Sequence, residues 1–315
     1  MADSNEPQWE RKVLERLASA ALAEQKSRRR WGIFFKLLGF AYLTLVLLLL
    51  VDWGDSTDKL ADGKKHTAVV ELDGVISPDT QASAENITEA LQKAFKDKTT
   101  QGVVLRINSP GGSPVQSGRI NDEIGRLRAK YPSIPLYVVV EDMCASGGYY
   151  VAAAADQIYV DKASIVGSIG VLMDGFGFTG TMDKLGVERR LLTAGENKGF
   201  LDPFSPQDAK QLEHAKVLLE DVHKQFIEVV RKGRGKRLKE TPELFSGLMW
   251  TGDQAVQLGL ADGFGSVEYV AREVIKAEDI KDFTVKQSLA DRLARQFGAD
   301  VAESMAGAFA RLRLR

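Results

Sequence analysis

Between residues 66 and 232 the chain alternates two hydrophobic patterns. Short apolar runs rich in β-branched residues predict strands, whereas apolar residues spaced by three or four positions predict helices. The expected strands are 67–72, 102–107, 136–140, 157–160, 165–173 and 187–193, and the expected helices are 86–98, 113–130 and 206–232. Because strands alternate with helices, we predict parallel βαβ units and an α/β fold.

The pattern before residue 66 is different. Residues 37–51 carry no charged side chain and end in a run of leucines. With a tryptophan at each end, residues 31–53 are long enough to cross a bilayer of about 30 Å. Basic residues precede this span and aspartates follow it, so the positive-inside rule places the N-terminus in the cytoplasm and the rest outside. A cleaved signal peptide is disfavoured, because the preceding segment is long and no A-x-A site follows.

These patterns divide the chain into segments. We expect a cytoplasmic N-terminal segment at 1–30, a transmembrane signal anchor at 31–53, a linker at 54–65, an α/β domain at 66–275 and a C-terminal extension at 276–315. In the extension, apolar residues recur every four positions before three arginines. An amphipathic helix and a frayed polar tail are both compatible with that spacing.

Composition excludes several classes of function. The 315 residues include 42 basic and 43 acidic side chains, so the near-neutral chain offers no electrostatic ground for binding nucleic acid. Its single cysteine, Cys144, cannot form an internal disulfide, and we expect a small buried hydrophobe there rather than a reactive thiol. The three histidines are widely separated, so we expect no metal site.

The stretch from Pro135 to Tyr150 joins a run of strand formers to a glycine-rich turn and a helix. In α/β folds such turns lie at the carboxyl edge of the sheet, where ligands bind. Ser146 lies at this turn, beside N–H groups of the first helical turn that can stabilise an oxyanion. A nucleophilic serine and a bystander serine in an ordinary turn are both compatible with this stretch.

Two further glycine-rich loops follow strands. The loop Asn108–Gly112 leads into a helix, and its N–H groups could converge on an anion beside Ser146, although a plain βα turn would look the same. The loop Gly175–Gly180 matches G-x-G-x-x-G. We reject a dinucleotide site there, because the loop is outside the first βα unit and carries two phenylalanines.

A nucleophilic serine needs a base. We expect His214 and His223, on the predicted helix 206–232, to be solvated or interfacial. Lys198 lies in a short loop bracketed by glycines and followed by apolar residues. A lysine acts as a base only when burial keeps it neutral, and a solvated surface lysine is the ordinary alternative.

Six sequence blocks, in a specific order and spacing, resemble the signal peptide peptidase A family of membrane-anchored serine proteases, which includes protease IV and SohB-type peptidases. The blocks are NSPGG (108–112), CASGGYY (144–150), SIVGSIGV (164–171), GENK (195–198), WTGDQA (250–255) and GLAD (259–262). The resemblance covers roughly residues 66–271, and the chain has one copy of the SGGYY and NKG sequences.

This resemblance implies a crotonase/ClpP-like fold and a Ser/Lys dyad that uses no metal or cofactor. By motif match, Ser146 is the nucleophile, Lys198 is the general base, Gly147 with Gly111 or Gly112 forms the oxyanion hole, and Ser168 hydrogen-bonds the lysine amine. The resemblance also implies a homo-oligomeric ring in which Lys198 reaches the serine of a neighbouring subunit.

The implied substrates are short peptides near the membrane, such as remnant signal peptides. The implied location is the bacterial inner membrane, with the anchor at 31–53 and the catalytic domain on the periplasmic side. A crotonase-like acyl-CoA enzyme and a non-catalytic membrane scaffold remain the alternative functions.

Overall fold

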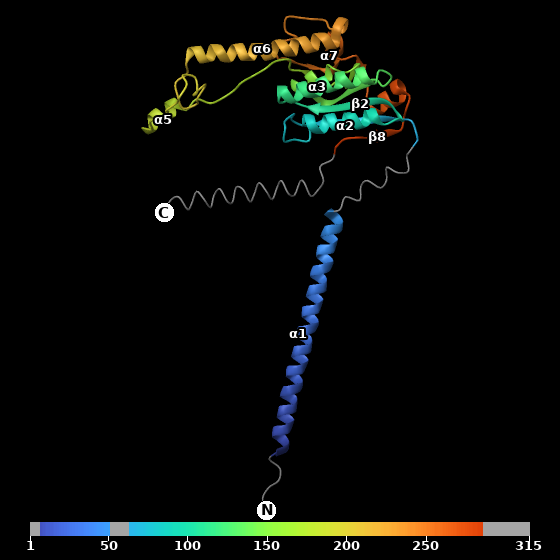
Figure 1. The fold of residues 1–315 in the computed structure, drawn as a ribbon, viewed down its shortest axis with the longest axis vertical. Coiled ribbons are helices and arrows are strands. Elements are labelled where there is room, and N and C mark those ends of the chain that lie inside the picture. The colour runs from blue at the N-terminus through green and yellow to red at the C-terminus, as the bar shows by residue number, and fades with distance from the viewer. Residues whose placement is uncertain (1–6, 51–62, 286–315) are drawn as a thin grey trace, which may run out of the picture. The chain divides into compact units, whose positions relative to one another are not determined.

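The computed structural model describes residues 7–50 and 63–285, which belong to two separate units. The first contains one continuous helix, α1 (Pro7–Leu50). Residues 63–285 form the second unit, which contains the α/β fold (Figure 1).

No helix within the described ranges has an apolar stretch long enough to cross a bilayer. The predicted transmembrane span, residues 31–53, is therefore not confirmed. Its C-terminal part, from residue 46 on, lies outside the residues whose side chains the structure describes.

Residues 63–285 are built around an eight-stranded sheet, in which six strands have the order β6-β5-β3-β2-β1-β8. The other two lie off this path: β4 pairs with β3, and β7 pairs with β4. All strand pairs are parallel except β5 with β6. The predicted α/β fold is confirmed. The strands are β1 (His66–Asp73), β2 (Thr100–Ser109), β3 (Leu136–Ala145), β4 (Gln157–Val160), β5 (Ile165–Gly167), β6 (Met249–Thr251), β7 (Gly263–Phe264) and β8 (Ile280–Asp282).

Helices cover the sheet unequally. The helices of this unit are α2 (Ala84–Lys96), α3 (Pro114–Lys130), α4 (Gly147–Ala152), α5 (Thr179–Leu185), α6 (Ala209–Arg234), η3 (Gly235–Arg237), α7 (Gly252–Leu258), α8 (Val267–Tyr269) and η4 (Val270–Ile275). Alternate residues of each strand face opposite sides, as the pleat requires. Val70, Leu105 and Val138 pack with α2, α3 and α4 in the larger core, whereas Val104 packs with α8 and η4 in a smaller one.

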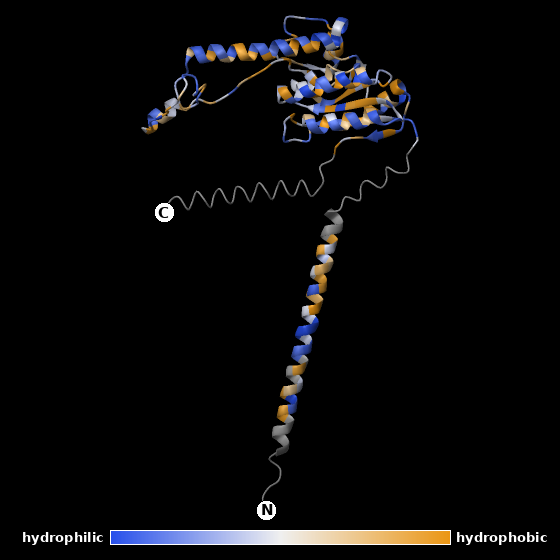
Figure 2. Cartoon of the chain, viewed as in Figure 1, coloured by the Kyte–Doolittle hydropathy of each residue, from blue (hydrophilic) through white to orange (hydrophobic). Residues whose placement is uncertain are grey.

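Local sequence accounts for the main elements. Ile87, Leu91 and Phe95 form the buried stripe of α2, whose N-terminus is capped by the Ser83 hydroxyl. Figure 2 shows apolar residues along the central strands and a mixture of polar and apolar residues on α6. The predicted helices 86–98, 113–130 and 206–232 and the first four predicted strands are confirmed, with boundary shifts of a few residues.

Two strand predictions are wrong. The strand expected at 165–173 ends at Gly167, because Ser168 adopts a φ of 50° that strand geometry does not allow. The strand expected at 187–193 is absent from the described structure. Its residues are exposed in a segment with no neighbouring strand to complete a ladder.

We call residues 172–208, which contain α5, the arm. Figure 1 shows α5 beyond the N-terminal end of α6, away from the sheet. The arm exposes large apolar side chains, among them Leu172 at 80%, Phe176 at 80% and Leu192 at 97%. Monomeric proteins rarely expose apolar groups in such numbers on one segment.

The second unit extends past residue 275, where we expected the domain to end. Strand β8 pairs in parallel with β1, through Thr67 with Ile280 and Val69 with Asp282. The amphipathic helix considered for the C-terminal extension falls on residues 286–315, which lie outside the described residues.

Candidate active site

The carboxyl ends of four segments meet at one edge of the sheet. Parallel register pairs Asp73 with Asn108, Ser109 with Cys144, and Ala145 with Gly167. The first half of β3 pairs with β4 and its second half with β5, so the end of β3 lies between β2 and β5. The turn that follows β3 therefore lies where α/β sheets bind ligands.

Ser146 is the turn residue between β3 and α4, with φ 49° and ψ −122°. Positive φ is unfavourable for a residue with a side chain, and such strain is characteristic of serine at a strand-to-helix nucleophile turn. The backbone holds this conformation by two hydrogen bonds: the Ser146 N–H donates to Gly167 O at 2.8 Å, and the Tyr150 N–H donates to Ser146 O at 3.0 Å.

The loop after β2 packs directly against this turn. A Cβ atom built on Gly111 would lie 2.7 Å from Ser146 Cβ and 2.6 Å from Gly147 N, so only glycine fits at position 111. Gly111 and Gly112 also have φ of +99° and +148°, which disfavour any side chain. The loop predicted from Asn108–Gly112 thus forms a wall beside Ser146.

Three glycine N–H groups lie near Ser146, those of Gly111, Gly112 and Gly147, and they differ in whether they already donate a hydrogen bond. The Gly111 N–H already donates to Ser109 Oγ at 3.1 Å. Gly147 is the first residue of α4, so its N–H has no acceptor within the helix. The hydrogen bonds found among the described residues engage neither Gly112 N–H nor Gly147 N–H, and Gly112 N lies 3.2 Å from the Cβ position of Gly147.

A pocket of about 610 Å³ opens at Ser146. Apolar side chains of α6 and of the chain after β5 form much of its wall, and Tyr150 stacks obliquely on Phe226 with ring centroids 5.2 Å apart. From the sequence, these α6 residues are only part of the apolar spacing that predicts the helix 206–232. The residues that line the pocket besides Ser146, Gly112 and Gly147 include Pro110, Ser117, Tyr150, Ser168, Val171, Leu172, Val222 and Phe226.

Ser168 lies in the same pocket as Ser146. It adopts a positive φ of 50°, and its N–H donates to Leu248 O at 2.8 Å. The residue before it, Gly167, accepts the Ser146 N–H, so the two serines lie on adjacent backbone segments.

Lys198 is not part of this pocket in the single chain. Lys198 is exposed in the arm, where its backbone N–H donates to Gly195 O at 3.1 Å. The structure therefore brings together Ser146, Gly111, Gly112, Gly147 and Ser168, and leaves Lys198 on another part of the surface.

The remaining candidates for reactive groups have other surroundings. Cys144 is fully buried, and burial raises the pKa of its thiol well above the usual range, which makes it a small hydrophobe as predicted. His223 Nε2 lies 3.1 Å from Ile169 O, and His214 packs edge-to-face on Phe200. Neither histidine lines the pocket at Ser146.

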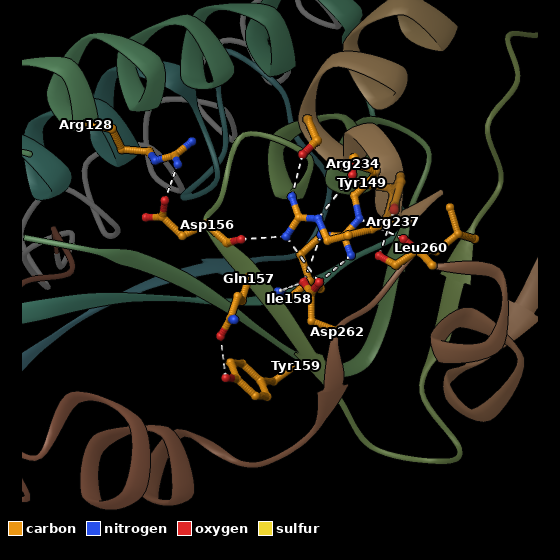
Figure 3. A network of polar contacts seen from close by, with 12 residues as sticks. Arg128, Tyr149, Asp156, Gln157, Ile158, Tyr159, Arg234, Arg237, Leu260 and Asp262 are labelled. Carbon is orange, nitrogen blue, oxygen red and sulfur yellow. Dashed lines mark hydrogen bonds and ion pairs between the residues drawn. The ribbon is translucent and has the colours of Figure 1, made fainter. Parts of the chain in front are cut away.

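Sequence reasoning missed a buried ion pair that ties α6 to the sheet (Figure 3). The Arg234 side chain is fully buried, and its Nη1 and Nη2 both donate to the Asp262 carboxylate at 2.9 Å. The Ile158 N–H donates to the same carboxylate at 2.7 Å. The only sequence signal was Asp262 at the end of the GLAD block.

Opposing effects act on the Asp262 carboxyl. Burial is the largest and pushes its pKa upward, but the hydrogen bonds and charge of Arg234, together with the Ile158 N–H, outweigh it and lower the pKa. Beside this pair, the Tyr149 hydroxyl donates to Leu260 O at 2.8 Å. The α4 helix that begins at the Ser146 turn is thereby connected to the GLAD block.

Comparisons with known proteins identify the family. The model of peptidase family S49 matches residues 128–281. A protein of Enterococcus faecium provisionally named signal peptide peptidase SppA is 34% identical over 242 residues, which cover 72% of this chain and 69% of that protein. The chain belongs to peptidase family S49.

Other relatives differ in how much of their length matches. The probable protease SohB of Haemophilus influenzae is 31% identical over 249 residues, 78% of this S49 chain and 68% of that protein. A Brucella melitensis protein named Na(+)/H(+) antiporter NhaA is 50% identical over 177 residues, 56% of this chain. The chain spans about a quarter of the length of that relative, with 24% covered. Ser146, Lys198 and Asp262 all fall within the S49 match.

Proposed function

We propose that this S49 chain is a serine endopeptidase whose nucleophile is Ser146. The observation that carries the proposal is the strained Ser146 turn in a largely apolar pocket that Gly112 and Gly147 also line, with no acceptor for either glycine N–H among the described residues. Backbone N–H donors close to a serine hydroxyl suit acyl transfer, since negative charge develops on the substrate carbonyl oxygen. We further propose that the sheet has the crotonase/ClpP-like topology.

The mechanism we propose uses a Ser/Lys dyad. Neutral Lys198 accepts the proton of Ser146 Oγ, which attacks the peptide carbonyl carbon. The oxyanion accepts hydrogen bonds from Gly112 and Gly147, and the lysine ammonium returns its proton to the leaving amine as the C–N bond breaks. Water, deprotonated by the same lysine, then hydrolyses the acyl-enzyme ester.

Lys198 would come from a neighbouring copy of the chain in a homo-oligomeric ring. In the single chain Lys198 is exposed on the arm and is absent from the pocket of its own Ser146. The exposed apolar side chains of the arm give it a surface that packing against another copy would bury. In such a packed site, apolar neighbours would favour the neutral amine, and Ser168 would hydrogen-bond it.

The substrates we propose are short, extended peptides such as remnant signal peptides. The support is the apolar wall of the pocket, formed by Val171, Leu172, Val222 and Phe226, which suits apolar side chains. The Enterococcus faecium relative carries a signal peptide peptidase name.

Attachment to the bacterial inner membrane is a separate proposal, which rests on the sequence. Residues 37–51 are uncharged, basic residues precede them and aspartates follow. We expect the full chain to stay with the membrane fraction after alkaline extraction, and a chain lacking residues 1–55 to be released. Release of the full chain by alkali would rule out a spanning segment at 31–53.

Covalent labelling tests the proposed activity directly. We expect a peptidyl phosphonate to add to the full-length chain in detergent, and peptide mapping to place the adduct on Ser146. A Ser164→Ala chain, which lacks another buried serine, should label normally. Absence of labelling together with thermal stabilisation by coenzyme A would favour the acyl-CoA enzyme, and absence of both would favour a non-catalytic scaffold.

A further inference from the structure

Ser109, the last residue of β2, is fully buried beneath the loop that carries Gly111 and Gly112. Its hydroxyl donates a hydrogen bond to Gly74 O at 2.6 Å and accepts one from the Gly111 N–H at 3.1 Å. A single hydroxyl therefore uses both its donor and its acceptor capacity to connect the end of β1 to the loop after β2.

Ser109 also contacts the helix that follows the nucleophile turn. A Cβ atom on Gly148 would lie 3.2 Å from Ser109 O and 3.4 Å from Ser109 Cβ. The backbone of α4 thus packs on Ser109 without an intervening side chain. Three segments that build the site meet at this residue: the turn after β1, the glycine loop and the start of α4.

The opposite side of the glycine loop is held by Ile76. The Ile76 N–H donates to Gly111 O and the Ser113 N–H donates to Ile76 O, both at 2.8 Å. This is a parallel bridge between Ile76 and Gly112, in which Gly112 directs its own N–H away from Ile76. Ser109 holds the Gly111 N–H and Ile76 holds the Ser113 N–H, so the backbone is fixed both before and after Gly112.

We propose that Ser109 is a positioning residue for the oxyanion hole. It holds the Gly111 N–H so that the Gly112 N–H, rather than that of Gly111, joins Gly147 in facing the substrate carbonyl. This assignment rests on the proposed peptidase function. Without the hydroxyl, the buried Gly111 N–H loses its partner, and the peptide groups of the loop can turn to find another.

Ser109→Ala tests this role in the full-length chain. We expect kcat for a peptide substrate to fall by ~10- to 100-fold, less than the 10²- to 10³-fold typical of losing an oxyanion donor outright, with KM nearly unchanged. A peptide aldehyde, whose adduct places an oxyanion in the hole, should lose affinity by a similar factor. Hydrogen exchange of a proteolytic peptide spanning residues 108–113 should become faster.

Ser164→Ala is the matched control. Ser164 is also a buried serine whose hydroxyl accepts from a backbone N–H, that of Asp161, and donates to a carbonyl, that of Glu141. It lies outside the pocket at Ser146. We expect both variants to lose thermal stability, and only Ser109→Ala to lose kcat and aldehyde affinity in its folded fraction.

Each outcome decides the proposal. If Ser109→Ala keeps the wild-type kcat, or loses activity only in proportion to its unfolded fraction as Ser164→Ala does, Ser109 does not position the hole. If the wild-type chain neither hydrolyses peptides nor reacts with a phosphonate, the peptidase function fails. The exchange measurement then still shows whether Ser109 anchors the glycine loop, and unchanged exchange would overturn the anchoring.

Discussion

A mixture of Ser146→Ala and Lys198→Ala chains is expected to hydrolyse peptides, although neither variant does so alone. Loss of the nucleophile or of the base of an acyl-transfer dyad typically costs at least ~10³-fold in kcat. In a ring where Lys198 enters the neighbouring pocket, a Ser146→Ala chain can supply its lysine to the serine of a Lys198→Ala chain. The measurement is the turnover of a fluorogenic peptide after the two purified variants are dissociated and reassembled together.

Two controls sharpen this prediction. Lys184 is another exposed lysine of the arm, on α5, and Lys184→Ala should keep full activity. Lys198→Arg should be as inactive as Lys198→Ala, because arginine stays protonated and cannot accept the serine proton. Mixtures that co-assemble yet stay inactive would refute the shared site, and a Lys198→Ala chain with robust turnover would refute the dyad.

Two inactive variants of Ser146 can show how much the strained turn costs the folded state, independently of catalysis. Ser146→Gly should be inactive like Ser146→Ala, but it relieves the cost of placing a side chain at a φ of 49°. Strained positions of this kind cost about 1–3 kcal/mol, so we expect the glycine variant to unfold at a higher temperature than the alanine variant. Equal stability of the two variants would mean that the turn stores no strain.

Asp262→Asn is expected to lower the free energy of unfolding by about 3–5 kcal/mol, the range typical when one partner of a buried ion pair is removed. The variant leaves the guanidinium of Arg234, whose side chain is 0% exposed, without a countercharge (Figure 3). Chemical denaturation of the full-length chain, followed by circular dichroism, measures the change.

Glu240→Gln provides the comparison, because its partner Arg231 lies on α6 as Arg234 does. Arg231 contacts Glu240 through two hydrogen bonds of 2.8 and 2.7 Å, but both side chains are about half exposed, at 54% and 43%. Exposed ion pairs contribute about 0–1 kcal/mol, so this variant should change stability little. Similar losses for both variants would contradict the importance of burial at Asp262.

The Arg234–Asp262 pair makes the stability of the fold fall at acidic pH. The folded-state pKa of Asp262 is lowered, so its carboxylate stabilises the fold above the unfolded-state pKa, about 4. That contribution is lost as the pH falls through the lower, folded-state pKa. Wild-type chains should therefore lose more stability than Asp262→Asn chains on acidification below about pH 4.

The sequence predicted the site in outline but misplaced parts of the fold around it. Its hydrophobic patterns located the central strands and helices, because those elements each bury a periodic face of their own. The pattern at 187–193 is equally strand-like, yet none of the strands in residues 63–285 pairs with the arm to complete its backbone hydrogen bonds. Strand pairing needs a second segment alongside, and the sequence of one segment does not show whether that partner is present.

The sequence by itself determined the α/β class, the order of the main strands and helices, and the motif blocks that mark family S49, because periodicity and motif spacing are local properties of the chain. Only the tertiary structure decided that Ser109 engages the Gly111 N–H, and that Arg234 pairs with Asp262. It alone also left Lys198 outside the pocket of its own Ser146. These outcomes depend on contacts between residues far apart in the sequence, which form only when the sheet brings the ends of its strands together.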